Sequence, residues 1–163
     1  MAIRKIVKIG DETLRKECRV QEKFDLRLAI LLKDMADTMY RAEGVGLAGP
    51  QVGVLRRVAV IDIGEGLVEL VNPVITSREG SQCGREGCLS LPGRQGIVTR
   101  PNVVKVRAQD RKGNPIEFTA EGFFARAVCH ELDHLDGRLY IDVMDRELTP
   151  EEIEGHVPED DYE

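Results

Sequence analysis

Residues 122–136 read GFFARAVCHELDHLD and predict a helix that presents two imidazole groups on one side. His130 and His134 are four positions apart, so on a helix they lie one above the other and can both reach one metal ion. Glu131 neighbours that face and can stand beside a water molecule at the metal. No proline interrupts the run, and Gly137 follows it as a stop signal.

An earlier helix and four strands are predicted on the N-terminal side of this segment. Residues 25–43 carry apolar side chains at helical spacing and end before a glycine, a typical stop. Short β-branched runs separated by turn residues predict strands at residues 58–63, 68–75, 103–108 and 116–120. This order predicts an α+β fold with mostly antiparallel β-sheets. We expect the sheets to pack around the central C-terminal helix, with one further helix near the N-terminus.

Length and composition predict one compact domain followed by an acidic tail. The chain has 163 residues, of which 42% are hydrophobic and 32% are charged, as is ordinary for a globular protein. We place the domain at residues 1–148 and the tail at residues 149–163, and we expect the tail to be partly disordered. The net charge of −6 argues against broad, nonspecific binding of DNA or RNA, which needs clustered lysine and arginine.

No segment of the chain has the character of a signal peptide or a membrane span. The N-terminus is mixed and polar, and no run approaches the roughly 20 apolar residues that a spanning helix needs. We therefore expect a cytoplasmic protein with no membrane partner. The four cysteines do not predict a disulfide framework in this context, so free or metal-bound thiols are expected.

A catalytic metal site needs a third protein ligand, because such a site usually takes three and leaves one position for water. After His134 the remaining histidine is His156, in the acidic tail, where we do not expect a ligand. The carboxylate of Asp142, downstream of His134, remains a candidate for this third ligand. Cys88, in the segment EGCLSLP, is the better candidate, because a thiolate is a soft anionic ligand for Fe(II), zinc or nickel. A buried and inert Cys88 thiol is the alternative.

A third informative segment is the glycine-rich run GVGLAGPQ at residues 44–51. Its three glycines allow the backbone to come close to another strand or to a ligand. The spacing of a dinucleotide-binding loop is absent, so a nucleotide site is a poor interpretation, and a tight turn is the alternative. Gln51, directly after a proline, offers a neutral amide where the backbone is restrained.

Together, these three segments resemble the peptide deformylase family. That family carries G-x-G-L-A-A-x-Q, E-G-C-L-S and H-E-x-D-H in this order, and the corresponding segments here are residues 44–51, 86–90 and 130–134. The resemblance covers about residues 1–145. It implies that residues 1–148 form a catalytic domain. The implied activity is removal of the N-formyl group from the N-terminal formylmethionine of newly synthesised polypeptides, with release of formate.

The resemblance also implies roles for particular residues. Cys88, His130 and His134 would hold one divalent metal ion, which in this family is usually Fe(II), although zinc, nickel or cobalt can occupy the site. Glu131 would take a proton from the metal-held water that attacks the formyl carbon, and would pass it to the departing amine. N-formylmethionyl nascent peptides are the implied partners, with a possible transient ribosome contact, and we expect a monomer.

The remaining implied roles concern the substrate. As the formyl oxygen becomes anionic, the side-chain amide of Gln51 and the backbone N–H of Leu89 would stabilise it together with the metal. Gly46 would offer its backbone to the peptide, which would bind as an added strand. Val45 and Ala127 would line an apolar pocket for the methionine side chain.

Several positions around these motifs carry further expectations. The family usually has alanine in place of Gly49 and often glutamine in place of Cys129. Cys129 lies about 100° around the helix from His130, so it should point away from the metal. We expect Glu86 to pair with Arg100 and hold the turn at Cys88. A solvent-exposed ion pair is the alternative. The acidic tail is short, which makes ribosome docking through it doubtful.

Two other functions remain open from the sequence. A zinc peptidase would use H-E-x-x-H with a third ligand other than cysteine, and it would cleave amide bonds inside chains. A catalytically inactive metal-binding relative would need neither Glu131 nor Gln51, and both residues are present.

Overall fold

The computed structural model describes residues 2–155 and confirms the α+β class with two antiparallel sheets. The first sheet has the order β1-β2-β3-β6-β7, from β1 (Gly46–Ala48), β2 (Val58–Ile61), β3 (Val68–Glu79), β6 (Val103–Gln109) and β7 (Pro115–Glu121). The second has the order β4-β5-β8, from β4 (Gln82–Cys88), β5 (Leu91–Arg100) and β8 (Arg146–Glu147). Neighbouring strands are antiparallel throughout both sheets.

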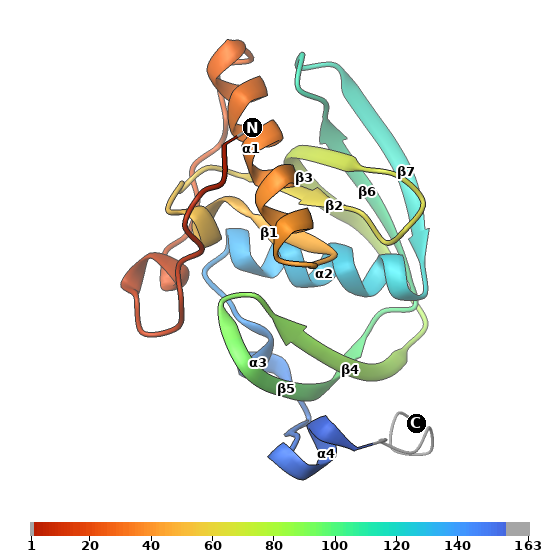
Figure 1. Ribbon diagram of the computed structural model, residues 1–163. Coiled ribbons are helices and arrows are strands. Elements are labelled where there is room, and N and C mark those ends of the chain that lie inside the picture. The colour runs from red at the N-terminus through yellow and green to blue at the C-terminus, as the bar shows by residue number, and fades with distance from the viewer. Residues whose placement is uncertain (1, 156–163) are drawn as a thin grey trace.

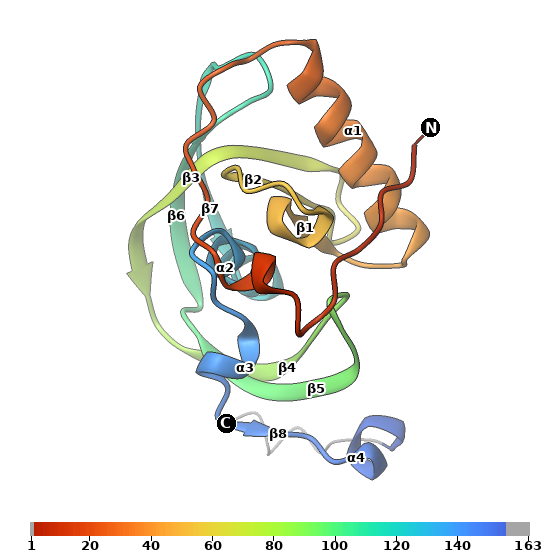
Figure 2. The ribbon, with the colours of Figure 1, turned by 90° about the vertical axis from the view of Figure 1, so that its left-hand side faces the viewer.

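The predicted C-terminal helix, α2 (Phe123–Leu135), lies between the two sheets (Figure 1). Seen along its axis, the helix has strands of both sheets around it (Figure 2). The N-terminal helix, α1 (Leu26–Arg41), packs on the first sheet beside β1 and β2. The shorter helices are η1 (Glu12–Arg15), η2 (Gly49–Val52), α3 (Tyr140–Val143) and α4 (Pro150–Glu154). The arrangement confirms the expectation of sheets packed around the H-E-x-x-H helix.

Strand β2 shows why the first sheet needs a helix on each face. Its side chains alternate between the two faces, as the pleat of a strand requires. Val58 and Val60 pack in the cluster that contains the apolar stripe of α1, whereas Ile61 packs in the cluster of α2. All four residues of β2 are buried. Because of this alternation, one face of β2 packs on α1 and the other face packs on α2.

Helix α1 begins and ends as its sequence predicts. The carboxylate of Asp25 accepts a hydrogen bond from the backbone N–H of Leu28 at 3.1 Å, which caps the first turn. Met35 and Met39 are fully buried on the apolar stripe. The chain leaves the helix at Arg41 and enters the glycine-rich run that leads to β1.

Most residues of helix α2 are buried, because the first sheet covers one side of the helix and the second sheet covers the opposite side (Figure 1). Ala125, Val128 and Leu132 pack towards the first sheet, in a cluster with β6 and β7. After the helix, Gly137 has a φ of 75°, and a methyl group there would lie 2.5 Å from the carbonyl oxygen of Arg15. This close approach requires glycine and directs the chain into α3.

The sequence did not predict β4 and β5 as strands, although they carry the second sheet. Glycines at positions 84, 87, 93 and 96 interrupt the apolar alternation by which a strand is recognised. The two strands are stabilised by pairing with each other along the whole hairpin, from Gln82 opposite Arg100 to Cys88 opposite Leu91. Local strand propensity contributes little. Strand β3 is also longer than predicted and continues to Glu79.

The C-terminal part of the described chain packs against the second sheet. Helix α4 starts with Thr149 as its capping residue, and Ile153 packs against Ile97 and Leu148. The rest of the expected acidic tail, including His156, lies outside the described residues. Within residues 2–155, no helix has the length and apolar character that crossing a membrane demands.

Candidate active site

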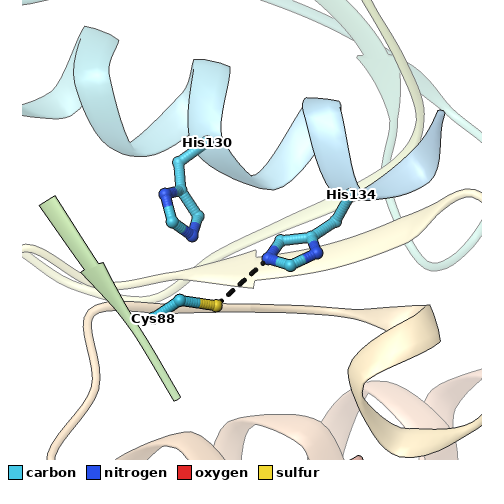
Figure 3. Close-up of side chains that lie close together, drawn as sticks. All are labelled: Cys88, His130 and His134. Carbon is cyan, nitrogen blue, oxygen red and sulfur yellow. Dashed lines mark hydrogen bonds between the residues drawn. The ribbon is translucent and has the colours of Figure 1, made fainter. Parts of the chain in front are cut away.

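The thiol of Cys88 and the imidazoles of His130 and His134 lie together between β4 and α2. One potential ligand atom from each lies within 4.8 Å of the other two. Figure 3 shows the two imidazoles side by side on α2, with Cys88 facing them from the end of β4. Nε2 of His134 lies 3.4 Å from Sγ of Cys88. A tetrahedral ion with ordinary metal–sulfur and metal–nitrogen distances would place its ligand atoms roughly 3.3–3.6 Å apart, so the three residues fit one metal ion.

The position of Cys88 depends on an irregularity at the end of β4. Regular pairing with β5 stops at Gly87 opposite Gln95, and the register then shifts so that Cys88 faces Leu91. Such a shift re-aims a side chain. Cys88 thereby packs against the cluster around Leu91 while its sulfur lies beside His134.

Nδ1 of His130 lies 2.9 Å from Oε1 of Glu86. An ionised carboxylate only accepts hydrogen bonds, so the proton of the neutral imidazole resides on Nδ1 and Nε2 is left for a metal. Burial lowers the pKa of His130, but the charge of Glu131 and the hydrogen bonds with Cys88 and Glu86 outweigh burial and raise this pKa well above its usual value. A bound cation would compete with that extra proton at the free nitrogen.

Two arginines hold the carboxylate of Glu86 in its buried position. Arg100 donates two hydrogen bonds of 2.9 Å to it, and Arg126 donates a third of 2.7 Å. Burial raises the pKa of Glu86, but the hydrogen bonds from Arg100 and His130 outweigh burial and lower it to about 2. The expected pairing of Glu86 with Arg100 is confirmed, and the pair is buried rather than exposed.

Arg126 is a contributor that the sequence did not indicate. It lies one turn before His130 on α2 and is 5% exposed. Its guanidinium also donates to the carbonyl oxygen of Val98 at 3.0 Å. An arginine within an otherwise apolar helical run is a signal for a buried anion, since such a charge is rarely buried without a partner. Asp133 also accepts a hydrogen bond of 2.7 Å from Arg100 and so joins the same network.

Glu131 is buried beside the metal-binding group without a hydrogen bond to one of its oxygens. It is 3% exposed, and its Oε1 has no hydrogen-bond partner among residues 2–155. Burial raises the pKa of Glu131 to about 7. A divalent cation nearby would favour the carboxylate and lower this pKa again. A methyl group at Gly46 would lie 2.3 Å from Oε2 of Glu131, so β1 and this carboxylate are in direct contact.

Gln51 is held so that its amide nitrogen faces Cys88. Its Oε1 accepts a hydrogen bond of 3.0 Å from the backbone N–H of Ala48. Its Nε2 donates to Ser90 Oγ at 3.1 Å and lies 3.4 Å from Sγ of Cys88. The oxygen is therefore engaged by the backbone, and the donor end of the amide is presented to the site.

The third proposed ligand, His134, and the nearby Cys129 have distinct environments. Burial lowers the pKa of His134 well below its usual value, which favours the neutral imidazole that a metal requires. Cys129 packs in the apolar cluster between α2 and the first sheet, as its position on the helix predicts. It is not part of the metal-binding group of Cys88, His130 and His134.

A cavity of about 420 Å³ opens beside the three potential ligands. Eight of the nine residues assigned to the site from the sequence line it: Val45, Gly46, Gln51, Cys88, Leu89, Ala127, His130 and Glu131. The ninth, His134, completes the metal-binding group. The structure therefore brings together residues from β1, η2, the β4–β5 turn and α2.

The structure explains why glycine occupies position 49, where the family usually has alanine. A methyl group there would lie 2.6 Å from the carbonyl oxygen of Val54 and 2.8 Å from that of Arg56. Backbone atoms cannot move aside as the end of a side chain can. In this chain the close packing of η2 on the following loop therefore requires glycine.

Comparisons with known proteins agree with this geometry. A family model described as Polypeptide deformylase matches residues 3–149. The peptide deformylase of Caldicellulosiruptor bescii is 60% identical over 154 residues, which cover 94% of this chain and 93% of that protein. That of Caldanaerobacter subterraneus subsp. tengcongensis is 55% identical, covering 95% of this chain and 98% of that protein. The crystal structure of peptide deformylase from Thermotoga maritima has a TM-score of 0.88 and 39% identity, covering 89% of this chain and 99% of that one. The chain therefore belongs to the polypeptide deformylase family.

Proposed function

We propose that this chain removes the N-formyl group from peptides that begin with formylmethionine and releases formate. The observation that carries the proposal is the grouping of one thiol and two imidazoles beside the buried carboxylate of Glu131, in a chain of this family. Cys88, His130 and His134 would hold one divalent ion. Fe(II) is the ion we propose for the cell, and zinc, nickel or cobalt would suit the same donors.

Such an ion supplies Lewis acidity, because it lowers the pKa of water and polarises a carbonyl group. Glu131 would receive a proton from the attacking water and then deliver it to the departing amine. Its burial beside Cys88, His130 and His134 supports this role, because burial raises the pKa of this carboxyl group and so favours uptake of a proton. The Glu86 network would meanwhile keep His130 in the tautomer that leaves Nε2 free.

Stabilisation of the developing oxyanion would fall to Gln51 and Leu89. The Gln51 amide is already oriented by Ala48, so it needs no reorganisation during the reaction. Leu89 directly follows Cys88 in the β4–β5 turn and lines the cavity, so its backbone N–H is close to the same region. A preorganised donor of this kind typically contributes about 3–4 kcal/mol to lowering the barrier.

The peptide would bind along the edges of the two sheets. Strands β1 and β4 are edge strands, and both contribute residues to the cavity wall. We propose that Gly46 offers its backbone to the substrate as an added strand. Val45 and Ala127 would contact the methionine side chain. Ala127 is buried on α2, whereas Val45 is 42% exposed at the opening, where a substrate would cover it.

We further propose a catalytic domain at residues 1–148 with an appended acidic tail at residues 149–163. The chain would act as a monomer in the cytoplasm, on nascent peptides and with transient ribosome contact. The relatives named above support the substrate and the setting, because they are bacterial peptide deformylases matched over nearly their full length.

The zinc-peptidase alternative is less well supported by the structure. It needs a third ligand other than Cys88, and Asp142 was the open candidate. The Asp142 carboxylate instead pairs with Arg15 and accepts a hydrogen bond from the backbone N–H of Leu139 at 2.8 Å. It is not part of the grouping formed by Cys88 and the two histidines.

The test is formate release from formyl-Met-Ala-Ser by protein prepared without oxygen and loaded with Fe(II). We expect the wild type to release formate and Glu131→Gln to lose at least about 100-fold in kcat while keeping its metal. Glu117→Gln is the matched control, because Glu117 is exposed on β7 outside the cavity. A fully metallated wild type that releases no formate would overturn the proposed function.

A further inference from the structure

The imidazole of His130 is contacted on one edge by Glu86 and on one face by Tyr140. The Tyr140 ring is stacked on it, with the ring centroids 6.0 Å apart and the planes 21° from parallel. Tyr140 is the first residue of α3, which the chain enters soon after the turn at Gly137. Tyr140 therefore contacts the proposed ligand His130 although it lies outside the three sequence motifs of the site.

The hydrogen bond to Glu86 alone leaves His130 free to tilt. Rotation of a histidine ring about its last side-chain bond has only a broad energetic preference, and a single hydrogen bond at Nδ1 tolerates small rotations of the ring plane. A second ring packed nearly parallel to the imidazole opposes this motion, because tilting reduces the contact between the faces. Tyr140 therefore supplies a restraint that Glu86 cannot.

Tyr140 is itself held rigidly. It is 1% exposed and packs in a cluster with Leu14, Leu91, Val98 and Leu139. Cys88 packs against the same cluster. One block of packed side chains thus supports the residue that fixes His130 and also contacts a second proposed ligand residue.

The hydroxyl group does not explain why a tyrosine is buried here. Tyr140 Oη is buried and makes no hydrogen bond to any residue in the range 2–155. A buried hydroxyl without a partner typically costs about 1–3 kcal/mol. The aromatic ring is therefore the part of Tyr140 that serves the site.

We propose that Tyr140 is a positioning residue that fixes the plane of the His130 imidazole for metal binding. The proposal deepens the proposed function and rests on its metal site. Residues that orient metal-bound histidines typically change metal affinity about 10–100-fold when they are removed. Loss of the Tyr140 ring is accordingly expected to weaken metal binding by at least about tenfold.

Two variants separate the ring from the hydroxyl group. Tyr140→Phe keeps the ring, and Tyr140→Leu removes it while leaving an apolar side chain. Leu28→Ala is the control for a simple loss of core packing, because Leu28 is 2% exposed but packs in the cluster of α1 and not in the cluster that holds Tyr140. The dissociation constant for Co(II) is measured by competition with a chelator, and the absorption spectrum of the bound Co(II) is recorded on the same samples.

We expect Tyr140→Phe to bind Co(II) within about twofold of wild type, because the ring stacked on His130 is kept. Tyr140→Leu should bind about tenfold more weakly and shift the Co(II) spectrum. Leu28→Ala should lose stability without either effect.

Wild-type affinity and spectrum in Tyr140→Leu would overturn the proposal, as would equal weakening by Leu28→Ala. Failure of the proposed function has a different signature. A wild type that binds Co(II) through these residues but releases no formate would overturn deformylation and leave the role of Tyr140 intact. A wild type that binds no metal would overturn both.

Discussion

The carboxylate of Glu86 lies 2.9 Å from Nδ1 of His130 and joins this histidine to two buried arginines. Because Glu86 balances Arg100 and Arg126, its removal would leave two cations buried without their shared anion. Breaking a buried, hydrogen-bonded ion pair typically costs about 3–5 kcal/mol, so Glu86→Ala should lower the free energy of unfolding by about that amount. Urea unfolding of the metal-free protein measures the change.

Glu147 provides the matched control for this prediction. It accepts two hydrogen bonds of 2.8 Å from Arg94, but both side chains are more than a third exposed, at 37% and 38%. Exposed ion pairs typically contribute about 0.2–1 kcal/mol, so Glu147→Ala should have only a small effect. Equal losses in the two variants would show that burial does not control the contribution of Glu86.

Cys88 and Cys129 should differ sharply in their effect on metal content. Cys88→Ala removes one of three proposed ligands and should abolish tight metal binding together with formate release. Cys129→Ala should retain one equivalent of metal, because Cys129 packs in the apolar cluster of α2. Elemental analysis after dialysis against a weak chelator checks both outcomes. Full metal content in Cys88→Ala would favour a peptidase-like ligand set.

Gly46→Ala should disable catalysis without removing the metal. The added methyl group would lie 2.3 Å from Oε2 of Glu131, so that carboxylate has to move. We expect kcat to fall by about 10²–10⁴, the usual contribution of a general acid–base group, at unchanged metal content. Gly44→Ala is the comparison, because its methyl group meets only the end of the Leu89 side chain, which can shift. A similar loss in both variants would contradict a specific contact with Glu131.

Gln51→Leu should lower kcat by about 10²–10³ while the metal stays bound, since it removes one donor to the oxyanion. Ser90→Ala removes only the hydroxyl that accepts from Gln51 Nε2, so a much smaller effect is expected. Steady-state kinetics on formyl-Met-Ala-Ser separates kcat from KM. A change confined to KM in Gln51→Leu would assign that residue to substrate binding instead.

The buried thiol of Cys18 should lower the free energy of unfolding at alkaline pH. Burial raises the pKa of this thiol from 9.0 to about 11, so the unfolded chain releases the proton before the folded chain does. Stability should therefore fall as the pH rises from about 9 towards 11, with a slope of at most about 1.4 kcal/mol per pH unit from this group. Urea unfolding at several pH values, in wild type and Cys18→Ala, isolates the effect. An identical slope in the two proteins would rule out this origin.

Local sequence patterns predicted the two long helices and most of the first sheet, but not the four short helices η1, η2, α3 and α4. The apolar spacing of residues 25–43 corresponds to α1, and residues 122–136 contain α2. The glycine-rich strands β4 and β5 were not predicted, because their order comes from pairing with each other and with β8 rather than from side-chain alternation. Arg126 and Tyr140 were overlooked at the site for a similar reason, since their roles depend on contacts with distant segments.

The sequence by itself determined that His130 and His134 share one side of a helix, because a spacing of four residues is a local property of helical geometry. It also indicated Cys88 as a third ligand, because a thiolate is a soft anionic donor, and placed Glu131 next to the metal-facing side of the helix. The role of Gln51 came from the resemblance to a known family. Only the tertiary structure decided that Cys88 faces these imidazoles, since this requires both sheets to close around α2 and the register to shift at the end of β4. The same packing buries Glu86 with two arginines and places Tyr140 on His130. Such contacts join residues that are distant in the chain, so no local pattern records them.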